Sequence, residues 1–272
     1  MTARAVWVNG QAVADAAHAV AYADRGFSYG DGLFETALLR DGTVRFLAAH
    51  LQRLRESCER LRIAYPGDAQ LAADIRGVSG NERDGVIKVV VTRGAWGRGY
   101  RPLSHLPSTR VVALHPLPVA DANSALSVRW CDLRLSRNAV LAGMKHLNRL
   151  ENVLAQMEWD DAAIGEGLLL DTEGELVSAT AGNIFIARYD ALYTPDLRYS
   201  GVRGVMRGQV LRAAAELGLS VSEEPLWPHD LEHATEVFVT SALRGIRPVI
   251  ALESLQWEAG PQARKLSAAL GL

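Results

Sequence analysis

Apolar and polar residues along the first half of the chain follow two different periods, separated by turn residues. The dipeptide Asp41-Gly42 lies between two extended segments, 33–40 and 43–46, and is typical of a β-hairpin turn. From residue 47 to residue 61, apolar side chains recur at every third or fourth position, which predicts an amphipathic helix. The β-branched run 86–92 predicts a buried strand. We therefore expect strands with helices packed against them.

The same criteria predict two lobes that each mix strands and helices. Pro116 and Pro118 indicate a linker within 115–124, so the expected lobes comprise residues 1–118 and 119–272. The predicted fold class is therefore α+β. Further strands are expected over 6–8, 110–114, 167–170, 176–181, 184–187, 237–240 and 248–252, and further helices over 69–78, 147–159, 206–217 and the C-terminal residues.

The composition is that of an ordinary globular protein, and it narrows the function classes. The chain has 272 residues, 49% hydrophobic and 22% charged, and a net charge of −2 with neutral histidines. This charge gives no field that favours nucleic acids or anionic membranes. Charged residues interrupt the apolar stretch 12–23, so we expect no signal peptide, no membrane span and a cytoplasmic protein. Cys58 and Cys131 lie far apart, so we expect free thiols and no metal site.

Lys145 stands in the sequence Gly-Met-Lys-His-Leu-Asn, residues 143–148, between a loop and the expected helix 147–159. A lysine at such a place is ordinarily solvated. A partly desolvated lysine, in contrast, has an amine whose pKa is lowered toward neutrality, which is what Schiff-base chemistry requires. Lys145 is therefore the candidate for covalent catalysis.

Two places have the chemistry to bind a phosphate group. Arg53 lies beside the apolar stripe of the helix 47–61, where it either covers apolar surface with its stem or binds a phosphate through two N–H groups. Residues 201–207, Gly-Val-Arg-Gly-Val-Met-Arg, lead into a helix whose first backbone amides can bind an anion. The segment matches neither a P-loop nor a dinucleotide-binding glycine motif.

A glycine-rich loop, residues 93–101, carries Arg93, Arg98, Tyr100 and Arg101. It is either a solvated hairpin tip or a clamp for carboxylates, since arginine binds carboxylates through paired N–H groups. The second interpretation predicts a small substrate with several negative charges.

Together these features resemble the branched-chain-aminotransferase-like class of pyridoxal-phosphate enzymes, known as fold type IV. The resemblance extends over nearly the whole chain, and three of its motifs, around 29–36, 93–100 and 145–149, resemble aminodeoxychorismate lyases more than aminotransferases. The six landmarks are Tyr29-Gly30-Asp31-Gly32-Leu33-Phe34-Glu35-Thr36, His50-Leu51-Gln52-Arg53-Leu54, Lys145-His146-Leu147-Asn148-Arg149, Gly182-Asn183-Ile184-Phe185, Gly204-Val205-Met206-Arg207, and Ser241-Ala242 ahead of Arg247-Pro248-Val249.

The resemblance implies a homodimer in which each chain has a small N-terminal two-layer α/β lobe and a larger C-terminal barrel-like lobe, with pyridoxal 5′-phosphate between them. It implies that Lys145 forms a Schiff base with this cofactor and that Thr36 shares in proton handling. By their position in the loop, Arg98 and Tyr100 are the candidates for binding the substrate's carboxylates. The phosphate ligands implied are Arg53, the amides of Val205 and Met206, and the hydroxyl of Ser241.

One position departs from the pattern of the class. Relatives typically have a glutamate five residues before the asparagine that matches Asn183, where it keeps the pyridine nitrogen protonated, and here that residue is Ser178. Glu175 lies an odd number of residues away, so on a regular strand it points to the opposite face. Because a hydroxyl supplies no countercharge, we expect a neutral ring nitrogen and a weaker electron sink. Transamination should suffer more from this than an elimination that ends in an aromatic ring.

We therefore expect a pyridoxal-phosphate-dependent carbon–oxygen lyase that converts 4-amino-4-deoxychorismate into 4-aminobenzoate and pyruvate, a reaction of folate biosynthesis. One alternative is an aminotransferase of the same fold that acts on branched-chain or D-amino acids. Two others are a non-catalytic binding protein of this fold and a phosphate- or nucleotide-binding domain without covalent chemistry. Lys145 and Arg53 argue against the non-catalytic protein, and the phosphate-binding domain leaves Lys145 unexplained.

Overall fold

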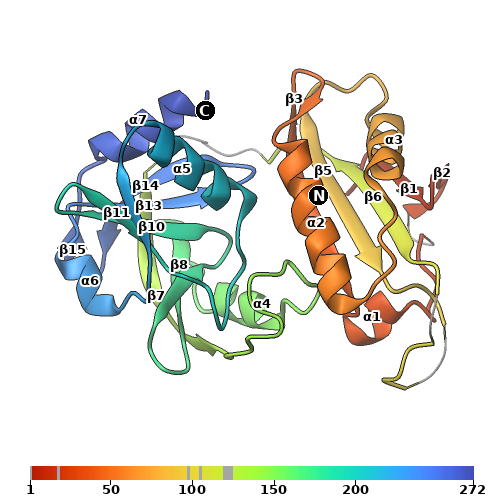
Figure 1. Ribbon diagram of the computed structural model, residues 1–272, viewed down its shortest axis with the longest axis horizontal. Coiled ribbons are helices and arrows are strands. Elements are labelled where there is room, and N and C mark those ends of the chain that lie inside the picture. Colours follow the sequence, from red (N-terminus) through yellow and green to blue (C-terminus); the bar gives the residue numbers. More distant parts are fainter. Residues whose placement is uncertain (1, 17–18, 97–98, 104–105, 119–124) are drawn as a thin grey trace. The chain divides into compact units, whose positions relative to one another are not determined.

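The computed structural model describes residues 2–16, 19–96, 99–103, 106–118 and 125–272. Its contacts divide the chain into two compact units (Figure 1). The first comprises the described residues up to 118 together with Met144–Asn148, and the second comprises 125–143 and 149–272. A short segment from the middle of the sequence therefore belongs to the first unit, and this segment carries Lys145.

The first unit is an antiparallel sheet of six strands with helices packed against it. The strand order is β2-β1-β6-β5-β3-β4, and the hairpin expected at Asp41-Gly42 joins β3 to β4. The strands are β1 (Ala5–Val8), β2 (Gln11–Ala12), β3 (Gly32–Arg40), β4 (Thr43–Val44), β5 (Gly85–Thr92) and β6 (Thr109–His115), and the helices are α1 (Arg25–Tyr29), α2 (Leu47–Leu61) and α3 (Asp68–Ser79).

Alternation along β3 separates the two faces of this sheet. Leu33, Glu35 and Leu39 are buried, and Glu35 contacts side chains of α2, so this set of residues points to the helices. The residues between them, among them Phe34 and Thr36, are half-buried and point to the opposite face. One strand therefore supplies side chains to a helix-covered face and to a second face with different chemistry.

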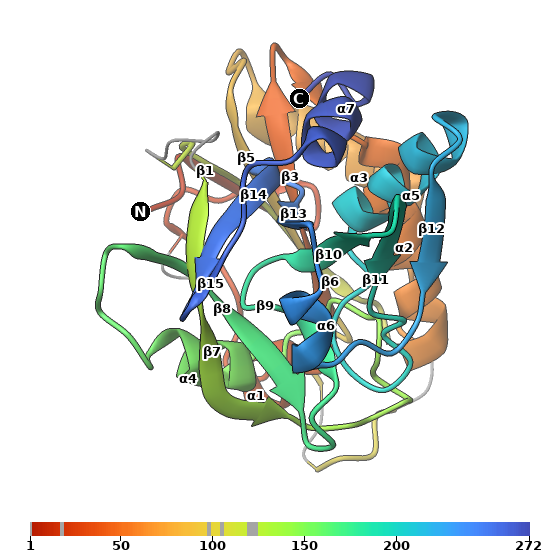
Figure 2. The same cartoon turned by 90° about the vertical axis from the view of Figure 1, so that its left-hand side faces the viewer.

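The second unit is built on a mixed sheet of nine strands that curls into a barrel-like layer (Figure 2). Apolar side chains of the sheet form a core on one of its sides, while α5 and α7 pack on the other over Phe185 and Phe238, whose rings stack 5.2 Å apart. The predicted α+β class is confirmed. The strands are β7 (Leu126–Leu135), β8 (Ile164–Asp171), β9 (Leu176–Ala179), β10 (Asn183–Arg188), β11 (Ala191–Thr194), β12 (Ser220–Glu223), β13 (Glu236–Ser241), β14 (Gly245–Leu252) and β15 (Leu255–Gln256), and the helices are α4 (Leu150–Gln156), α5 (Val205–Glu216), α6 (Pro228–Glu232) and α7 (Pro261–Ala269).

The helix expected over 147–159 is shorter than predicted, because its first residues pair with a strand instead. The amide of Phe34 donates to the carbonyl of Lys145 at 2.9 Å, and the amide of Leu147 donates to the carbonyl of Gly32 at 3.0 Å. Backbone groups used in this way cannot also form helical hydrogen bonds, so α4 begins only at Leu150.

Strand β7 was not predicted, because its alternation of apolar and polar residues changes phase between Trp130 and Cys131, where its pairing with β8 is irregular. Its backbone pairs in parallel with β14 on one side and β8 on the other, and these partners are distant in sequence. The guanidinium of Arg129 donates to the carbonyl of Glu158 at 2.7 Å, which keeps this charged side chain satisfied beside the sheet. None of the helices in the described part of the chain is both long enough and apolar enough to span a bilayer.

Candidate active site

Lys145 lies on a segment that is fastened to β3 by its backbone. Leu33 and His146 form an antiparallel bridge, flanked by the two hydrogen bonds that involve Phe34 and Leu147. The ammonium nitrogen of Lys145 lies 4.3 Å from the centroid of the Phe34 ring. The position of the lysine is therefore set by main-chain pairing, and its amine lies over an aromatic side chain of the face that α2 does not cover.

Two glycines allow this segment to approach β3 closely. A Cβ atom at Gly30, whose φ is +64°, would stand 2.4 Å from Oδ1 of Asn148, and one at Gly32 would stand 2.8 Å from a methyl carbon of Leu147. The side-chain amide of Asn148 also donates to the carbonyl of Gly30 at 3.1 Å. The motifs at 29–36 and 145–149 are thus the two sides of one contact, and a side chain at either glycine would displace the segment that carries Lys145.

Thr36 lies on the same face as Phe34, two residues further along β3, and Lys88 of β5 is its cross-strand partner. The ammonium nitrogen of Lys88 lies 5.8 Å from the centroid of the Phe34 ring. Phe34, Thr36, Lys88 and Lys145 therefore gather on one face of the sheet, and we call this group the Phe34 cluster. The two candidate catalytic residues, Lys145 and Thr36, are both members.

Lys88 was missed at the sequence level, although its signal was present. It is an exposed lysine within a run of β-branched residues whose neighbours Ile87 and Val89 are buried. No carboxylate of the described residues forms an ion pair with it. Its charge, after burial itself, lowers the pKa of the nearby His115. Lysine is depleted in strands, so an exposed Lys88 in this position makes the face a candidate site for a ligand.

Arg53 is held by a buried carboxylate. Its Nε and Nη2 atoms donate to the two oxygens of Glu35 at 2.8 and 2.5 Å, and Nδ1 of His50 lies 2.7 Å from Oε2. Burial acts to raise the pKa of Glu35, but the charge of Arg53 and the hydrogen bonds from His50 and Arg53 outweigh it, so this pKa lies below its ordinary value. Arg53 therefore does more than cover apolar surface with its stem.

The second unit contains the helix start that the sequence indicated. Gly204 is the N-cap of α5 and receives no side-chain cap, so the amides of Val205 and Met206 have no acceptor within the helix. The side chain of Asn183 accepts from the amide of Gly204 at 3.1 Å and donates to the carbonyl of Val202 at 2.8 Å. These hydrogen bonds fix the residues before the helix, and the first amides of the helix stay available to bind an anion.

Strand β13 lies next to β10 and carries two hydroxyl residues at its end, Thr240 and Ser241, whose side chains alternate between the two faces of the sheet. Ser241 is half-buried, and its Oγ accepts from the amide of Arg244 at 3.2 Å. Thr240, the cross-strand partner of Asn183, is 1% exposed, and its Oγ1 has no hydrogen-bond partner among the described residues. An unsatisfied buried hydroxyl is costly unless a ligand completes it.

Ser178 is buried in β9, where it pairs with Leu169 of β8. Glu175 lies in the turn before β9, and its carboxylate is 3.5 Å from both Arg137 and Arg198, so it is engaged there. Whether Ser178 faces a cofactor ring stays a prediction.

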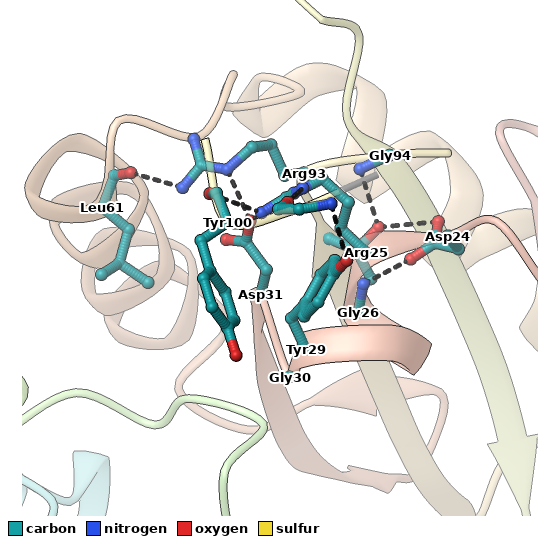
Figure 3. A network of polar contacts seen from close by, with 12 residues as sticks. Asp24, Arg25, Gly26, Tyr29, Gly30, Asp31, Leu61, Arg93, Gly94 and Tyr100 are labelled. Carbon is teal, nitrogen blue, oxygen red and sulfur yellow. Dashed lines mark hydrogen bonds and ion pairs between the residues drawn. The ribbon is translucent and has the colours of Figure 1, made fainter. Parts of the chain in front are cut away.

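The glycine-rich loop is anchored at its base by a network of buried polar groups (Figure 3). Arg25, which is 3% exposed, donates to the carboxylate of Asp31 and to the carbonyls of Gly99 and Tyr100 at 2.9 to 3.1 Å. Arg93 donates to the same carboxylate at 2.8 Å and to two carbonyls at the end of α2. Arg93 therefore has a structural role.

Of the two loop residues expected to bind substrate, one can be placed. Tyr100 is 88% exposed, and its ring centroid lies 5.8 Å from that of Tyr29. Arg98 lies outside the described residues. Their role in substrate binding stays a prediction.

A family model described as amino-transferase class IV matches residues 32–252. The chain belongs to this family. The matched range includes β3 with the Phe34 cluster, the segment of Lys145, the start of α5 and the end of β13. The match begins within the motif 29–36 and includes the later motifs.

Similar proteins within class IV are named either as lyases or as aminotransferases. An aminodeoxychorismate lyase of Vibrio harveyi is 32% identical over 89% of this chain and 89% of its own. A protein of Methanocaldococcus jannaschii named "Putative branched-chain-amino-acid aminotransferase" is 33% identical over 91% of this chain and 88% of its own. The crystal structure of 4-amino-4-deoxychorismate lyase from Pseudomonas aeruginosa superposes with a TM-score of 0.92 at 39% identity, covering 97% of both chains. The expected fold type IV is thereby confirmed, and the choice between the two reactions is not made by family membership.

Proposed function

We propose that this class IV protein is a pyridoxal-phosphate-dependent lyase that converts 4-amino-4-deoxychorismate into 4-aminobenzoate and pyruvate. The observation that carries the proposal is the Phe34 cluster, in which a lysine amine, a threonine hydroxyl and a second lysine share one sheet face. These are a base, a proton donor and a cation for a carboxylate. The 39% identity to the Pseudomonas aeruginosa lyase structure supports the same assignment.

The residues of the chain fit pyridoxal phosphate. Lys145 offers a half-buried amine for the covalent linkage, and the uncapped start of α5 offers the amides of Val205 and Met206 to the phosphate. Arg53 and the hydroxyl of Ser241 complete the proposed phosphate ligands.

When bound, the cofactor supplies an electron sink that acidifies the C–H bond at the amine-bearing carbon of the substrate. Lys145 Nζ is the proposed base that removes this proton. The ammonium that results lies over the Phe34 ring, whose face stabilises a cation. The place of Lys145 therefore suits both the neutral amine that accepts the proton and the ammonium that results.

The second proton transfer goes to the methylene carbon of the departing pyruvate enol. The donors available in the Phe34 cluster are the ammonium of Lys145 and the hydroxyl of Thr36, which lies on the same face of β3 as Phe34. Loss of the enol leaves an aromatic ring, so no group of the protein has to stabilise a further charge on the product.

Lys88 is the proposed ligand of a substrate carboxylate. Aminodeoxychorismate carries two carboxylates, and Lys88 is an exposed cation beside Thr36 with no ion-pair partner among the described residues. It joins Arg98 and Tyr100, the loop residues proposed for the same task. We also propose that the active protein is a homodimer, which sedimentation of the purified chain tests.

Ser178 favours elimination over transamination in this proposal. A serine hydroxyl cannot supply the countercharge that keeps a pyridine nitrogen protonated, and the nearby carboxylates are engaged elsewhere. Glu175 is bound by two arginines, while Glu166 accepts hydrogen bonds from Thr180 and from the amide of Ala181. A weaker electron sink suffices for a reaction that is driven by aromatisation.

The second candidate is an aminotransferase for branched-chain or D-amino acids, which the 33% identity to the Methanocaldococcus jannaschii relative favours. A half-reaction separates the two candidates. An aminotransferase converts its bound cofactor to the amine form when it receives an amino acid alone, and the shift is visible in the absorbance spectrum. A lyase leaves the spectrum of the bound cofactor unchanged.

The proposal is tested by incubating the purified holoprotein with aminodeoxychorismate. We expect 4-aminobenzoate and pyruvate to form in equal amounts, with no requirement for an amino-group acceptor. Formation of the amine form of the cofactor from amino acids, without 4-aminobenzoate from aminodeoxychorismate, would make the protein an aminotransferase instead.

A further inference from the structure

The guanidinium of Arg53 is fixed from behind by Glu35, an arrangement that phosphate binding alone does not require. The two hydrogen bonds of 2.8 and 2.5 Å use Nε and Nη2 of Arg53, and they define both the plane and the rotation of the guanidinium. Glu35 is 3% exposed and lies on β3, while Arg53 lies on α2. The pair therefore links the sheet to the helix inside the first unit.

His50 fixes the carboxylate in turn. Its Nδ1 lies 2.7 Å from Oε2 of Glu35, and it precedes Arg53 by one helical turn on the same face of α2. His50 is 2% exposed, and its Nε2 has no partner among the described residues. Because both oxygens of Glu35 are occupied by α2, the carboxylate has no freedom to rotate away from Arg53.

Two physical effects of Glu35 on phosphate binding have opposite signs. Its negative charge offsets that of Arg53 and so weakens the attraction to a phosphate dianion. Its two hydrogen bonds remove the rotamer freedom of a long side chain, so that less entropy is lost when the guanidinium binds. If the effect of charge is the larger, removal of the Glu35 carboxylate tightens phosphate binding. If the effect of orientation is the larger, the same removal weakens phosphate binding.

We propose that Glu35 is a positioning residue that holds the guanidinium of Arg53 in the orientation that binds the cofactor's phosphate, with His50 holding Glu35. This inference rests on the proposed function, in that it takes Arg53 as a phosphate ligand. It adds a residue of the helix-covered sheet face to the machinery, although that residue touches neither cofactor nor substrate.

The test compares pyridoxal phosphate with pyridoxal, which lacks the phosphate, as ligands of the full-length chain freed of cofactor. Binding is followed by the absorbance of the lysine linkage in wild type and E35Q. We expect E35Q to bind pyridoxal phosphate about 10- to 100-fold more weakly, by analogy with the outer-shell partners of metal ligands, and pyridoxal as tightly as wild type does. Tighter binding of pyridoxal phosphate by E35Q, or an unchanged affinity, would overturn the inference.

A matched control is available in the same unit. Asp74 of α3 forms a buried ion pair with Arg110 of β6, with 2.5 Å between Oδ2 and Nε. D74N therefore removes a comparable carboxylate from a comparable pair, away from the Phe34 cluster. We expect D74N to lower stability while leaving both affinities unchanged, and an equal loss of pyridoxal phosphate affinity in D74N would make the effect of E35Q merely structural.

A conservative variant keeps the test decisive if E35Q folds poorly. E35D retains the charge but withdraws the carboxylate by one methylene, so it cannot keep both hydrogen bonds to Arg53. We expect a smaller loss of discrimination between the two ligands than in E35Q, and wild-type discrimination in E35D would contradict the positioning role. Failure of the proposed function looks different, because the wild-type chain itself would then form no borohydride-reducible linkage at Lys145 or, with that linkage formed, would release no 4-aminobenzoate.

Discussion

The two faces of the six-stranded sheet in the first unit differ in whether their charged side chains form ion pairs. On the helix-covered face, the carboxylates of Glu35 and Asp74 are almost fully buried, and each forms a hydrogen-bonded pair with an arginine. On the opposite face, Lys88 is exposed and forms no ion pair within the described part of the chain. Buried charges must be paired, whereas a cation left without a carboxylate is available to a ligand. The face of Phe34, which we call the chemical face, is therefore the proposed site of the reaction.

The largest effect is expected from Lys145 on the chemical face. K145A should abolish the borohydride-reducible cofactor linkage and reduce turnover at least about 10³-fold, because both the covalent anchor and the base are removed. The linkage is checked by mass spectrometry after reduction, and turnover by release of 4-aminobenzoate. Lys265, an exposed lysine of α7, serves as the control through K265A. Full activity in K145A would refute the proposed mechanism.

A smaller effect is expected from Lys88 on the same face. K88M should raise KM about 10- to 100-fold with a smaller change in kcat, because a charge-assisted contact to a substrate carboxylate contributes about 1.5–3 kcal/mol. The stem of methionine keeps the packing against Phe34. Steady-state kinetics measure the change, and an unaltered KM would show that the unpaired cation does not bind substrate.

A substitution on the helix-covered face should lower the free energy of unfolding rather than change KM. Loss of one partner from a buried ion pair costs about 3–5 kcal/mol, so E35Q should lower the free energy of unfolding at pH 7 by about this amount. Because the pKa of Glu35 is lowered in the folded state, this stabilisation is present above its ordinary value of 4.5 and is lost as the pH falls through the folded pKa. Urea unfolding of the cofactor-free wild type and E35Q, at pH 7 and at a pH below 4.5, measures this stabilisation.

Glu166 is the matched control for that pH dependence. Its pKa is raised, first by burial, so its ionised form costs stability at neutral pH and the cost disappears as the pH falls. On acidification, wild type should therefore lose stability relative to E35Q and gain stability relative to E166Q. The same direction in both variants would contradict the assignment of Glu35 as the paired carboxylate.

The smallest effect is expected in the second unit, at Ser178. S178A should reduce turnover by less than about tenfold, the equivalent of one neutral hydrogen bond, if the ring nitrogen is already uncharged. Release of 4-aminobenzoate measures it, with K145A as the reference for a severe loss. A decrease as large as that of K145A would show that the serine hydroxyl takes part in the chemistry.

Local pattern was sufficient for the elements whose period is unbroken. The hairpin at Asp41-Gly42, the amphipathic helix α2 and the β-branched strand β5 all lie where their periods predict them. It was insufficient for β7, whose alternation changes phase at Trp130-Cys131, where the pairing with β8 is irregular. Periodicity reports which side of an element is buried, and it contains no information on which strand lies beside it.

The sequence by itself determined the chemical parts of this protein: the lysine of the motif 145–149, the glycines of 29–36, the arginine of α2 and the helix start at Gly204. Only the tertiary structure decided how the first unit combines its share of them. It placed Lys145 on the edge of β3, brought Lys88 beside Thr36, and gave Arg53 a buried carboxylate as its partner. The physical reason is that edge pairing, cross-strand register and ion pairs join residues tens of positions apart, and these contacts form only when the chain is folded.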